Sequence, residues 1–319
     1  MLRSFLIYLS QADWARQIVT RWDFAWRAAS RFVAGEQLED AIRVVKILNE
    51  KKINATLDHL GEHTTNPEKA SRATNDIIEI LEVIDREGVQ SNVSIKLTQI
   101  GLAVDEDLCE RNLMAILSEA ERYNTFVRID MEDSQWVEKT LSLFYSAVDK
   151  FNPENVGIVI QSYLYRSEDD VLRLLETGSR IRLCKGAYKE PEEVAYPKKS
   201  DVDDNFDYLV ELLVAGVSSN NTPTLSEDGK IPPIPAIATH DEERINFAKQ
   251  YLGEKELHKS AIEFQMLHGI RRDLQSSLAT EGYPVRVYVP YGSEWYPYYT
   301  RRLAERPANL WFFISNFFR

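Results

Sequence analysis

Residues 92–131, NVSIKLTQIGLAVDEDLCERNLMAILSEAERYNTFVRIDM, contain the pattern that decides the fold. The two ends of this stretch, 92–97 and 126–131, are short and mainly apolar, which favours buried β-strands. Between them, 105–122 carries apolar residues at helical spacing. Strands that alternate with helices in this way usually belong to one parallel sheet. The stretch therefore predicts a strand–helix–strand unit.

The same alternation continues along the chain on both sides of this unit. The other candidate strands are 53–58, 156–161, 180–184, 235–239, 261–265 and 285–289. The other amphipathic stretches are 68–86, 134–149, 167–176, 203–218, 241–254 and 268–281. Eight such strands with no obvious break predict an α/β fold of the closed (βα)8, TIM-barrel type. The alternative is a doubly wound open sheet, which usually carries a G-x-G-x-x-G motif that is absent here.

Residues 1–50 differ from the rest of the chain in their pattern of apolar residues, which shows no strand-like alternation. Aromatic and small residues recur there at spacings of three and four, which predicts helices: Trp14, Ile18, Trp22, Ala25, Trp26 and Ala29. So many tryptophans would be costly in solvent, so this segment is expected to pack on another surface. The predicted organisation is an N-terminal helical arm, 1–50, and a barrel domain, 51–319.

Composition excludes several classes of function. Asp and Glu together number 50 and Lys and Arg 38, so the formal net charge is -12 and a nucleic acid is not an expected partner. The chain has two cysteines, Cys109 and Cys184, which imply no disulfide framework and favour a cytoplasmic location. The apolar run at 5–9 is short for a signal peptide and far short of a membrane span.

Polar residues gather at the predicted C-terminal ends of the strands, where barrels build their active sites. They are Asp58, Glu62, Lys96, Asp130, Gln161, Arg182, Lys185, Thr239, His240, Gln265 and Tyr288. His59 and His63, with acids nearby, are candidate metal ligands. No H-x-H or H-E-x-x-H pattern occurs, however, and no metal is expected. A G-x-S-x-G serine elbow is also absent.

Two of these residues are charged groups inside apolar strands. Lys96 shares a strand face with Ser94, and a lysine inside a barrel is costly to bury unless it meets an anion. Asp130 is the most inward of the acids that end the stretch 126–133, so it is the expected partner of Lys96. The alternative for Lys96 is an edge position that reaches solvent.

The segment 180–188, RIRLCKGAY, supplies a third charged group within a predicted strand, Arg182, and then a turn. Gly186 and Ala187 let a backbone approach a flat ligand, and Lys185 can meet a phosphate. Thr239 and His240 follow the sixth predicted strand and could bind ribose or phosphate, whereas Asp241 is expected to cap the next helix.

The segment 295–305, WYPYYTRRLAE, predicts a final helix that begins near Pro297 and ends before Pro307. One face of this helix carries Tyr298, Arg301, Arg302 and Glu305. Adjacent guanidiniums on such a face can fork a carboxylate or phosphate. The alternative is a solvated face whose i,i+4 charge pair contributes only ~0.3 kcal/mol.

With these residues in view, the chain resembles the bacterial proline dehydrogenases of the single-activity type. The resemblance lies in seven motifs that occur in the family's order: SIKLT (94–98), RIDMED (128–133), RLCKGAY (182–188), ATHD (238–241), EFQMLHG (263–269), RVYVPYG (286–292) and YYTRRLAE (298–305). It implies a distorted (βα)8 barrel that holds FAD, with the final helix over the barrel mouth. It also implies oxidation of L-proline to 1-pyrroline-5-carboxylate, the first step of proline degradation to glutamate. In that family the hydride passes to flavin N5 and the electrons leave to a membrane quinone.

The resemblance assigns a role to each matching position. The residues expected to hold the proline carboxylate are Lys96, Arg301 and Arg302, and those expected to wall its ring are Leu267, Tyr288 and Tyr298. Arg182 resembles the arginine near flavin N5 and Asp130 the acid that supports Lys96, so both are expected to be catalytic. Further FAD contacts are expected from Met131, Gln161, Lys185, Gly186, Ala187, Thr239 and His240. Glu305 resembles an acid that orients the arginine pair, and Glu62 a gate acid for Arg301.

The aromatic tail is a candidate for peripheral contact with a membrane. Leu310, Phe313, Ile314 and Phe317 form an apolar stripe, which could instead pack on the barrel or on the arm. Two rival functions stay open from the residues alone. One is a Schiff-base enzyme that uses Lys96 or Lys185, and the other is a barrel that only binds amino acids or a partner.

Overall fold

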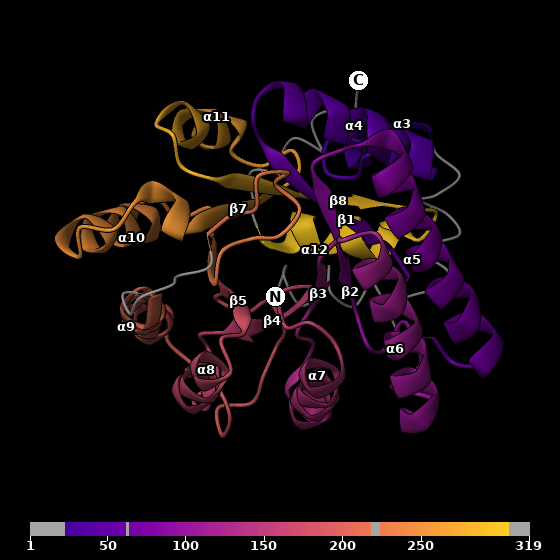
Figure 1. The fold of residues 1–319 in the computed structure, drawn as a ribbon, viewed down its shortest axis with the longest axis horizontal. Helices are drawn as coiled ribbons and strands as arrows, with labels where there is room; N and C mark the ends of the chain where they lie inside the picture. The colour runs from indigo at the N-terminus through magenta and orange to yellow at the C-terminus, as the bar shows by residue number, and fades with distance from the viewer. Residues whose placement is uncertain (1–22, 62–63, 218–223, 306–319) are drawn as a thin grey trace.

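The computed structural model describes residues 23–61, 64–217 and 224–305. Its centre is a closed barrel of eight parallel strands that follow one another in chain order (Figure 1). The strands are β1 (Asn54–His59), β2 (Ser91–Ile95), β3 (Val127–Ile129), β4 (Val156–Gln161), β5 (Arg180–Cys184), β6 (Pro235–Ala238), β7 (Glu263–Leu267) and β8 (Val285–Tyr291). Pairing of β1 with β8, from Asn54↔Arg286 to His59↔Tyr291, closes the ring. The predicted barrel is confirmed.

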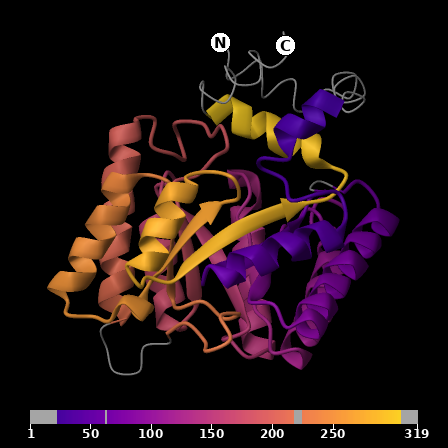
Figure 2. The same cartoon turned by 90° about the horizontal axis from the view of Figure 1, so that it is seen from above.

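Helices surround the barrel and cover one end of it. The surrounding helices are α4 (Leu38–Glu50), α5 (Pro67–Glu87), α6 (Glu106–Arg122), α7 (Val137–Lys150), α8 (Ser167–Glu176), α9 (Lys199–Val217), α10 (Glu242–Glu254) and α11 (Arg272–Thr280). Figure 2 shows α3 (Asp23–Ala29) and α12 (Trp295–Glu305) together above one end of the barrel. Because α12 follows β8, this end is the one where the strands terminate.

The strands place their polar residues inside the barrel and their apolar residues against the helices. On β8, Val285, Val287 and Val289 belong to the main apolar core, whereas Arg286 and Tyr288 form hydrogen bonds inside the barrel, to the neighbouring strand β7 and to Asp130. Alternation with period two produces this division. The result is a barrel whose interior is built for polar contacts and whose hydrophobic stabilisation lies between the strands and the helices.

Local capping residues fix where the helices begin and end. Asn66 accepts a hydrogen bond from the Lys69 N–H at the start of α5, and Asp105 accepts one from the Leu108 N–H at the start of α6. Gly88 ends α5 in a left-handed conformation at φ 61°. The caps set the first and last residues of these helices, and the strands all end at the same rim of the barrel because they are parallel.

A second apolar cluster joins α3 to α12. Trp26 lies 5.5 Å from Trp295 and Phe32 lies 6.2 Å from Tyr299, measured between ring centroids. The Trp295 Nε1–H also donates to Glu36 at 3.1 Å. The helix α3 therefore packs on the helix that covers the strand ends, while α4 packs on β1 and β8 as part of the outer ring. The division of the chain at residue 50 stays a prediction.

Most predicted segments differ from the observed ones by a few residues at their ends, and two of the differences have a clear local cause. The seventh strand spans 263–267 rather than 261–265, because Lys259–Ala261 forms a short 3-10 turn. The helix predicted at 268–281 begins only at Arg272, because Gly269 and Arg271 adopt positive φ angles of 77° and 51°, which do not fit an α-helix.

Candidate active site

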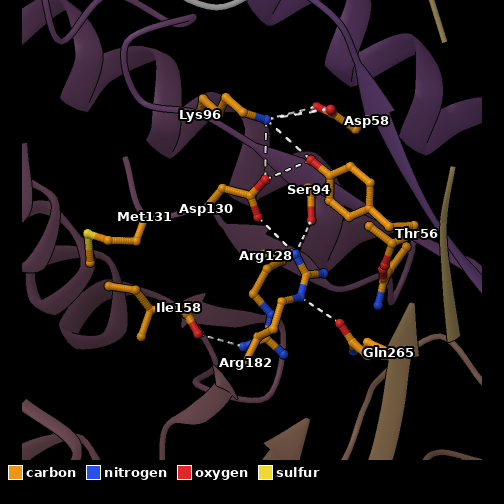
Figure 3. A network of polar contacts seen from close by, with 12 residues as sticks. Thr56, Asp58, Ser94, Lys96, Arg128, Asp130, Met131, Ile158, Arg182 and Gln265 are labelled. Carbon is orange, nitrogen blue, oxygen red and sulfur yellow. Dashed lines mark hydrogen bonds and ion pairs between the residues drawn. The ribbon is translucent and has the colours of Figure 1, made fainter. Parts of the chain in front are cut away.

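Four predicted residues meet at the barrel mouth in one polar network (Figure 3). Lys96 Nζ lies 3.3 Å from Asp130 Oδ2 and 3.2 Å from the Tyr288 hydroxyl. The other carboxylate oxygen of Asp130 accepts a hydrogen bond from Arg182 Nη1 at 2.9 Å. Tyr288 donates to Asp130 at 2.8 Å. Strands that are distant in sequence thus supply two cations that share one carboxylate.

Burial makes this network electrostatically strong. Asp130 is only 9% exposed, and burial alone would raise its pKa. Lys96, Arg182 and the Tyr288 hydroxyl outweigh that effect and hold the pKa of Asp130 below its ordinary value. Burial, followed by the neighbouring carboxylates, raises the pKa of Tyr288 well above its ordinary value. Tyr288 therefore stays a neutral donor, and Asp130 stays charged at neutral pH.

A second carboxylate, Asp58, also contacts Lys96. Its Oδ1 lies 3.4 Å from Lys96 Nζ, and the residue is 1% exposed. The sequence placed Asp58 at a strand end but gave it no role. The signal that could have assigned one is its alternation with Thr56 on β1, since both side chains make contacts inside the barrel.

A pocket opens between Lys96, Asp58 and α12. Its lining includes Lys96 and Asp58 from the barrel and Tyr298 and Arg301 from α12. The predicted cations Lys96 and Arg301 therefore share one cavity. Arg302 lies 5.1 Å from the centre of the Tyr298 ring, and Leu267 packs against the α3–α12 cluster.

Gln161 and Met131 lie together beside this network. Gln161 Nε2 donates to the Met131 carbonyl at 3.4 Å. The Oε1 atom of Gln161 is buried and has no hydrogen-bond partner among the described residues. A buried acceptor without a partner is costly, so this atom marks a place where a donor from a ligand would be stabilising.

The turn after β5 carries the other predicted ligand-binding positions. Lys185 Nζ contacts Asp203 at 2.5 Å and Asp241 at 2.6 Å. Gly186 has a φ of 107°, and a Cβ there would come within 2.5 Å of the Tyr163 ring, so glycine is required. Ala187 beside it is exposed.

Thr239 and His240 sit at the end of β6, both engaged with backbone. The Asp241 N–H donates to the Thr239 hydroxyl at 3.1 Å, and the Leu267 N–H donates to His240 Nε2 at 3.0 Å. Asp241 caps α10 as expected, by accepting from the Glu243 N–H. Its second contact, with Lys185, was not expected from sequence.

Several predicted residues fall outside the described positions. These are Trp14, Ile18 and Trp22 of the arm, Glu62, His63, the side chain of Glu305 and the aromatic tail that includes Leu310, Phe313, Ile314 and Phe317. Within the described ranges, no group of three or more His, Cys, Asp or Glu side chains has the arrangement of a metal site.

Comparison with known proteins gives one consistent result. The profile of the family described as Proline dehydrogenase matches residues 41–314. The Proline dehydrogenase of Deinococcus radiodurans is 44% identical over 294 residues, which cover 91% of this chain and 90% of that relative. Proline dehydrogenase 1 of Bacillus subtilis (strain 168) is 40% identical over 318 residues, covering 99% of this chain and 98% of the relative.

The fold also matches a solved structure, that of proline utilization A from Bdellovibrio bacteriovorus inactivated by N-propargylglycine. The TM-score is 0.80 at 25% sequence identity, and the match covers 88% of this chain but 33% of that longer one. A profile match over most of the chain and identities of 40% or more over nearly its whole length show that it belongs to the proline dehydrogenase family, oxidoreductases that act on proline.

Proposed function

We propose that the protein is an FAD-dependent L-proline dehydrogenase that forms 1-pyrroline-5-carboxylate. The observation that carries this proposal is the meeting of Lys96 and Arg301 in one pocket beside the buried Arg182–Asp130 pair. Such a pocket suits a small zwitterion whose carboxylate needs cations and whose oxidation needs a neighbouring electron acceptor.

The described residues fit a flavin. Gln161 offers a buried acceptor without a partner, which suits a ring N–H, and Arg182 offers a buried cation. The proposed holding residues are Met131, Gln161, Arg182, Lys185, Gly186, Ala187, Thr239 and His240. When bound, FAD would supply the two-electron acceptor, with flavin N5 as the proposed acceptor of the hydride from proline C5.

Proline binding is proposed to depend on three cationic side chains and on three side chains that contact the proline ring. Lys96, Arg301 and Arg302 hold the carboxylate, and Leu267, Tyr288 and Tyr298 enclose the ring. Pinning the carboxylate fixes the position of C5, and a pocket with little water strengthens these charge pairs. The cations also favour loss of the amine proton, which must precede hydride departure. Glu305 and Glu62 are proposed to orient Arg301 and Arg302.

Electrons are proposed to leave to a membrane quinone, from a cytoplasmic protein that touches the inner face of the membrane. The aromatic tail is the proposed contact, and it lies outside the described residues. Among the described helices, none combines the length and apolarity needed to cross a bilayer.

The test is an anaerobic titration with L-proline after reconstitution with FAD. A yellow protein whose flavin absorbance bleaches on addition of proline is expected. Bleaching by another amine but not by proline would move the substrate assignment. A protein that takes up no flavin but gives a borohydride-stable adduct with a carbonyl substrate would replace the proposal with Schiff-base chemistry.

A further inference from the structure

Beneath Arg182, a line of buried polar side chains runs down the barrel interior through β7 and β8. Arg182 Nε donates to Gln265 Oε1 at 2.5 Å. Gln265 Nε2 donates to Glu263 Oε1 at 2.6 Å, and Arg286 Nε donates to the same oxygen at 2.8 Å. Glu263 is 0% exposed, Arg286 1% and Gln265 5%, so water does not compete for these contacts.

The order of charges along this line fixes which way the Gln265 amide faces. Arg286 grips both oxygens of Glu263, the second at 3.1 Å, and also donates to the backbone carbonyls of Ala55 and Gly229. An ionised carboxylate only accepts hydrogen bonds, so Gln265 must turn its NH2 group towards Glu263. Its carbonyl oxygen is then the atom that Arg182 meets.

Arg182 is consequently held on two edges. Gln265 takes the Nε–H, while Asp130 and the Ser94 hydroxyl take Nη1 at 2.9 and 3.0 Å (Figure 3). A planar guanidinium that is fixed at both Nε and one Nη cannot rotate about its long axis. Without Gln265 only the Asp130–Ser94 edge would remain.

We propose that Gln265, oriented by Glu263 and Arg286, is a positioning residue that sets the guanidinium plane of Arg182 for proline oxidation. The inference rests on the proposed function, because it is the proposed function that assigns Arg182 a role in proline oxidation. Gln265 itself makes its contacts with Arg182 and Glu263 and acts through them.

The variant Gln265→Met removes both hydrogen-bonding ends at similar length. Loss of a hydrogen bond to a charged group predicts a fall in kcat of about tenfold to a hundredfold, with the KM for proline within about twofold. The matched control is Asn92→Met. Asn92 is also a buried polar residue of the barrel interior, 1% exposed, and bonds Thr56 and the Lys230 carbonyl rather than Arg182. The Asn92→Met variant should lower the melting temperature about as much as Gln265→Met does, and its kcat should stay within about twofold of wild type.

A charge swap separates positioning from simple packing. In Glu263→Gln/Gln265→Glu, an acceptor still faces Arg182 and the number of charges is unchanged, so kcat should recover to within about threefold of wild type. Equal kcat losses in Gln265→Met and Asn92→Met would overturn the inference, as would a swap no better than Gln265→Met. So would an unchanged kcat in Gln265→Met.

A readout without turnover keeps this inference distinct from the proposed function. The protein is labelled with ¹⁵N-arginine, and the Arg182 Nε–H resonance is assigned as the one that is lost in Arg182→Lys. Its chemical shift should change in Gln265→Met and should keep its wild-type value in Asn92→Met. If wild type fails to oxidise proline but this shift is seen, the proposed function falls and the contact stands. If wild type is active and no shift is seen, the inference alone falls.

Discussion

Lys96 contacts two carboxylates, Asp58 and Asp130, which differ in their other hydrogen-bond partners. Asp58 lies 3.4 Å from Lys96, whereas Asp130 also accepts from Arg182 and Tyr288. Asp130→Asn should therefore cost about 3 kcal/mol of stability and lower kcat/KM about a hundredfold, since the buried Arg182 loses its carboxylate partner and, of these two carboxylates, Lys96 keeps only Asp58. Asp58→Asn should lower kcat/KM only about tenfold. Steady-state kinetics with proline and thermal melts check both, and equal losses would contradict the ranking.

His268 predicts a specific dependence of stability on pH. Burial, with Arg272 acting in the same direction, lowers the pKa of His268 to about 4. The unfolded chain takes up this proton near pH 6.5, so the stability from a neutral His268 is complete above that pH and is lost as the pH falls towards 4. The melting temperature of wild type should therefore fall more steeply than that of His268→Gln between pH 6.5 and 4.5. A difference between the two proteins that is constant with pH would contradict this.

At the scale of single elements, the turn after β7 lies against the segment that links α3 to α4. A Cβ at Gly269 would lie 1.7 Å from the Arg31 carbonyl oxygen, and the φ there is 77°. Gly282 has a similar φ of 87° but no neighbouring atom within 4 Å. Gly282→Ala should cost about 1 kcal/mol, from the backbone alone. Gly269→Ala must also displace the segment that links α3 to α4.

That displacement should reach the substrate. Since α3 packs on α12, and α12 carries Arg301 and Arg302, we expect Gly269→Ala to raise the KM for proline about tenfold with a smaller change in kcat. Gly282→Ala should leave KM unchanged. Kinetics and melts of the two variants test this, and a KM for Gly269→Ala equal to that of wild type would show that α12 keeps its place without α3.

Regular elements were predictable where a single periodicity governs them. The predicted ranges 156–161, 180–184 and 167–176 are those of β4, β5 and α8. The 268–271 turn was missed because Arg271 adopts a positive φ of 51°, and an arginine in the sequence does not indicate a positive φ. Similarly, residues 261 and 262 were predicted as the start of a strand, but pairing with β6 begins only at Glu263.

The site was predictable only in part, for a related reason. Lys96, Asp130 and Arg182 stand out because each is a charge within an apolar strand. The roles of Asp58, Asp203 and Gln265 depend on partners on or directly after other strands, 38, 18 and 83 residues away. Such contacts follow from closure of the ring and from helix placement, which alternation does not encode.

At the scale of the whole molecule, the described chain has two apolar cores of unequal extent. The main core spans all eight strands and the surrounding helices, whereas the second joins α3 and α12 with a few loop residues. Fewer buried contacts mean a smaller free energy of opening. In native-state hydrogen exchange, amides of α3 and α12 should therefore exchange together, and faster than those of β4 and β5.

The coupling between α3 and α12 can be tested through Trp26. Its ring packs on Trp295, so Trp26→Ala should speed exchange in both helices about tenfold or more while β4 and β5 keep their rates. Ile47→Ala is the control, because Ile47 is 52% exposed on α4 and outside the second core. Adding proline should slow exchange in α12, since a ligand held by its arginines stabilises the closed form by mass action. Acceleration confined to α3 would mean that α12 is held by the barrel alone.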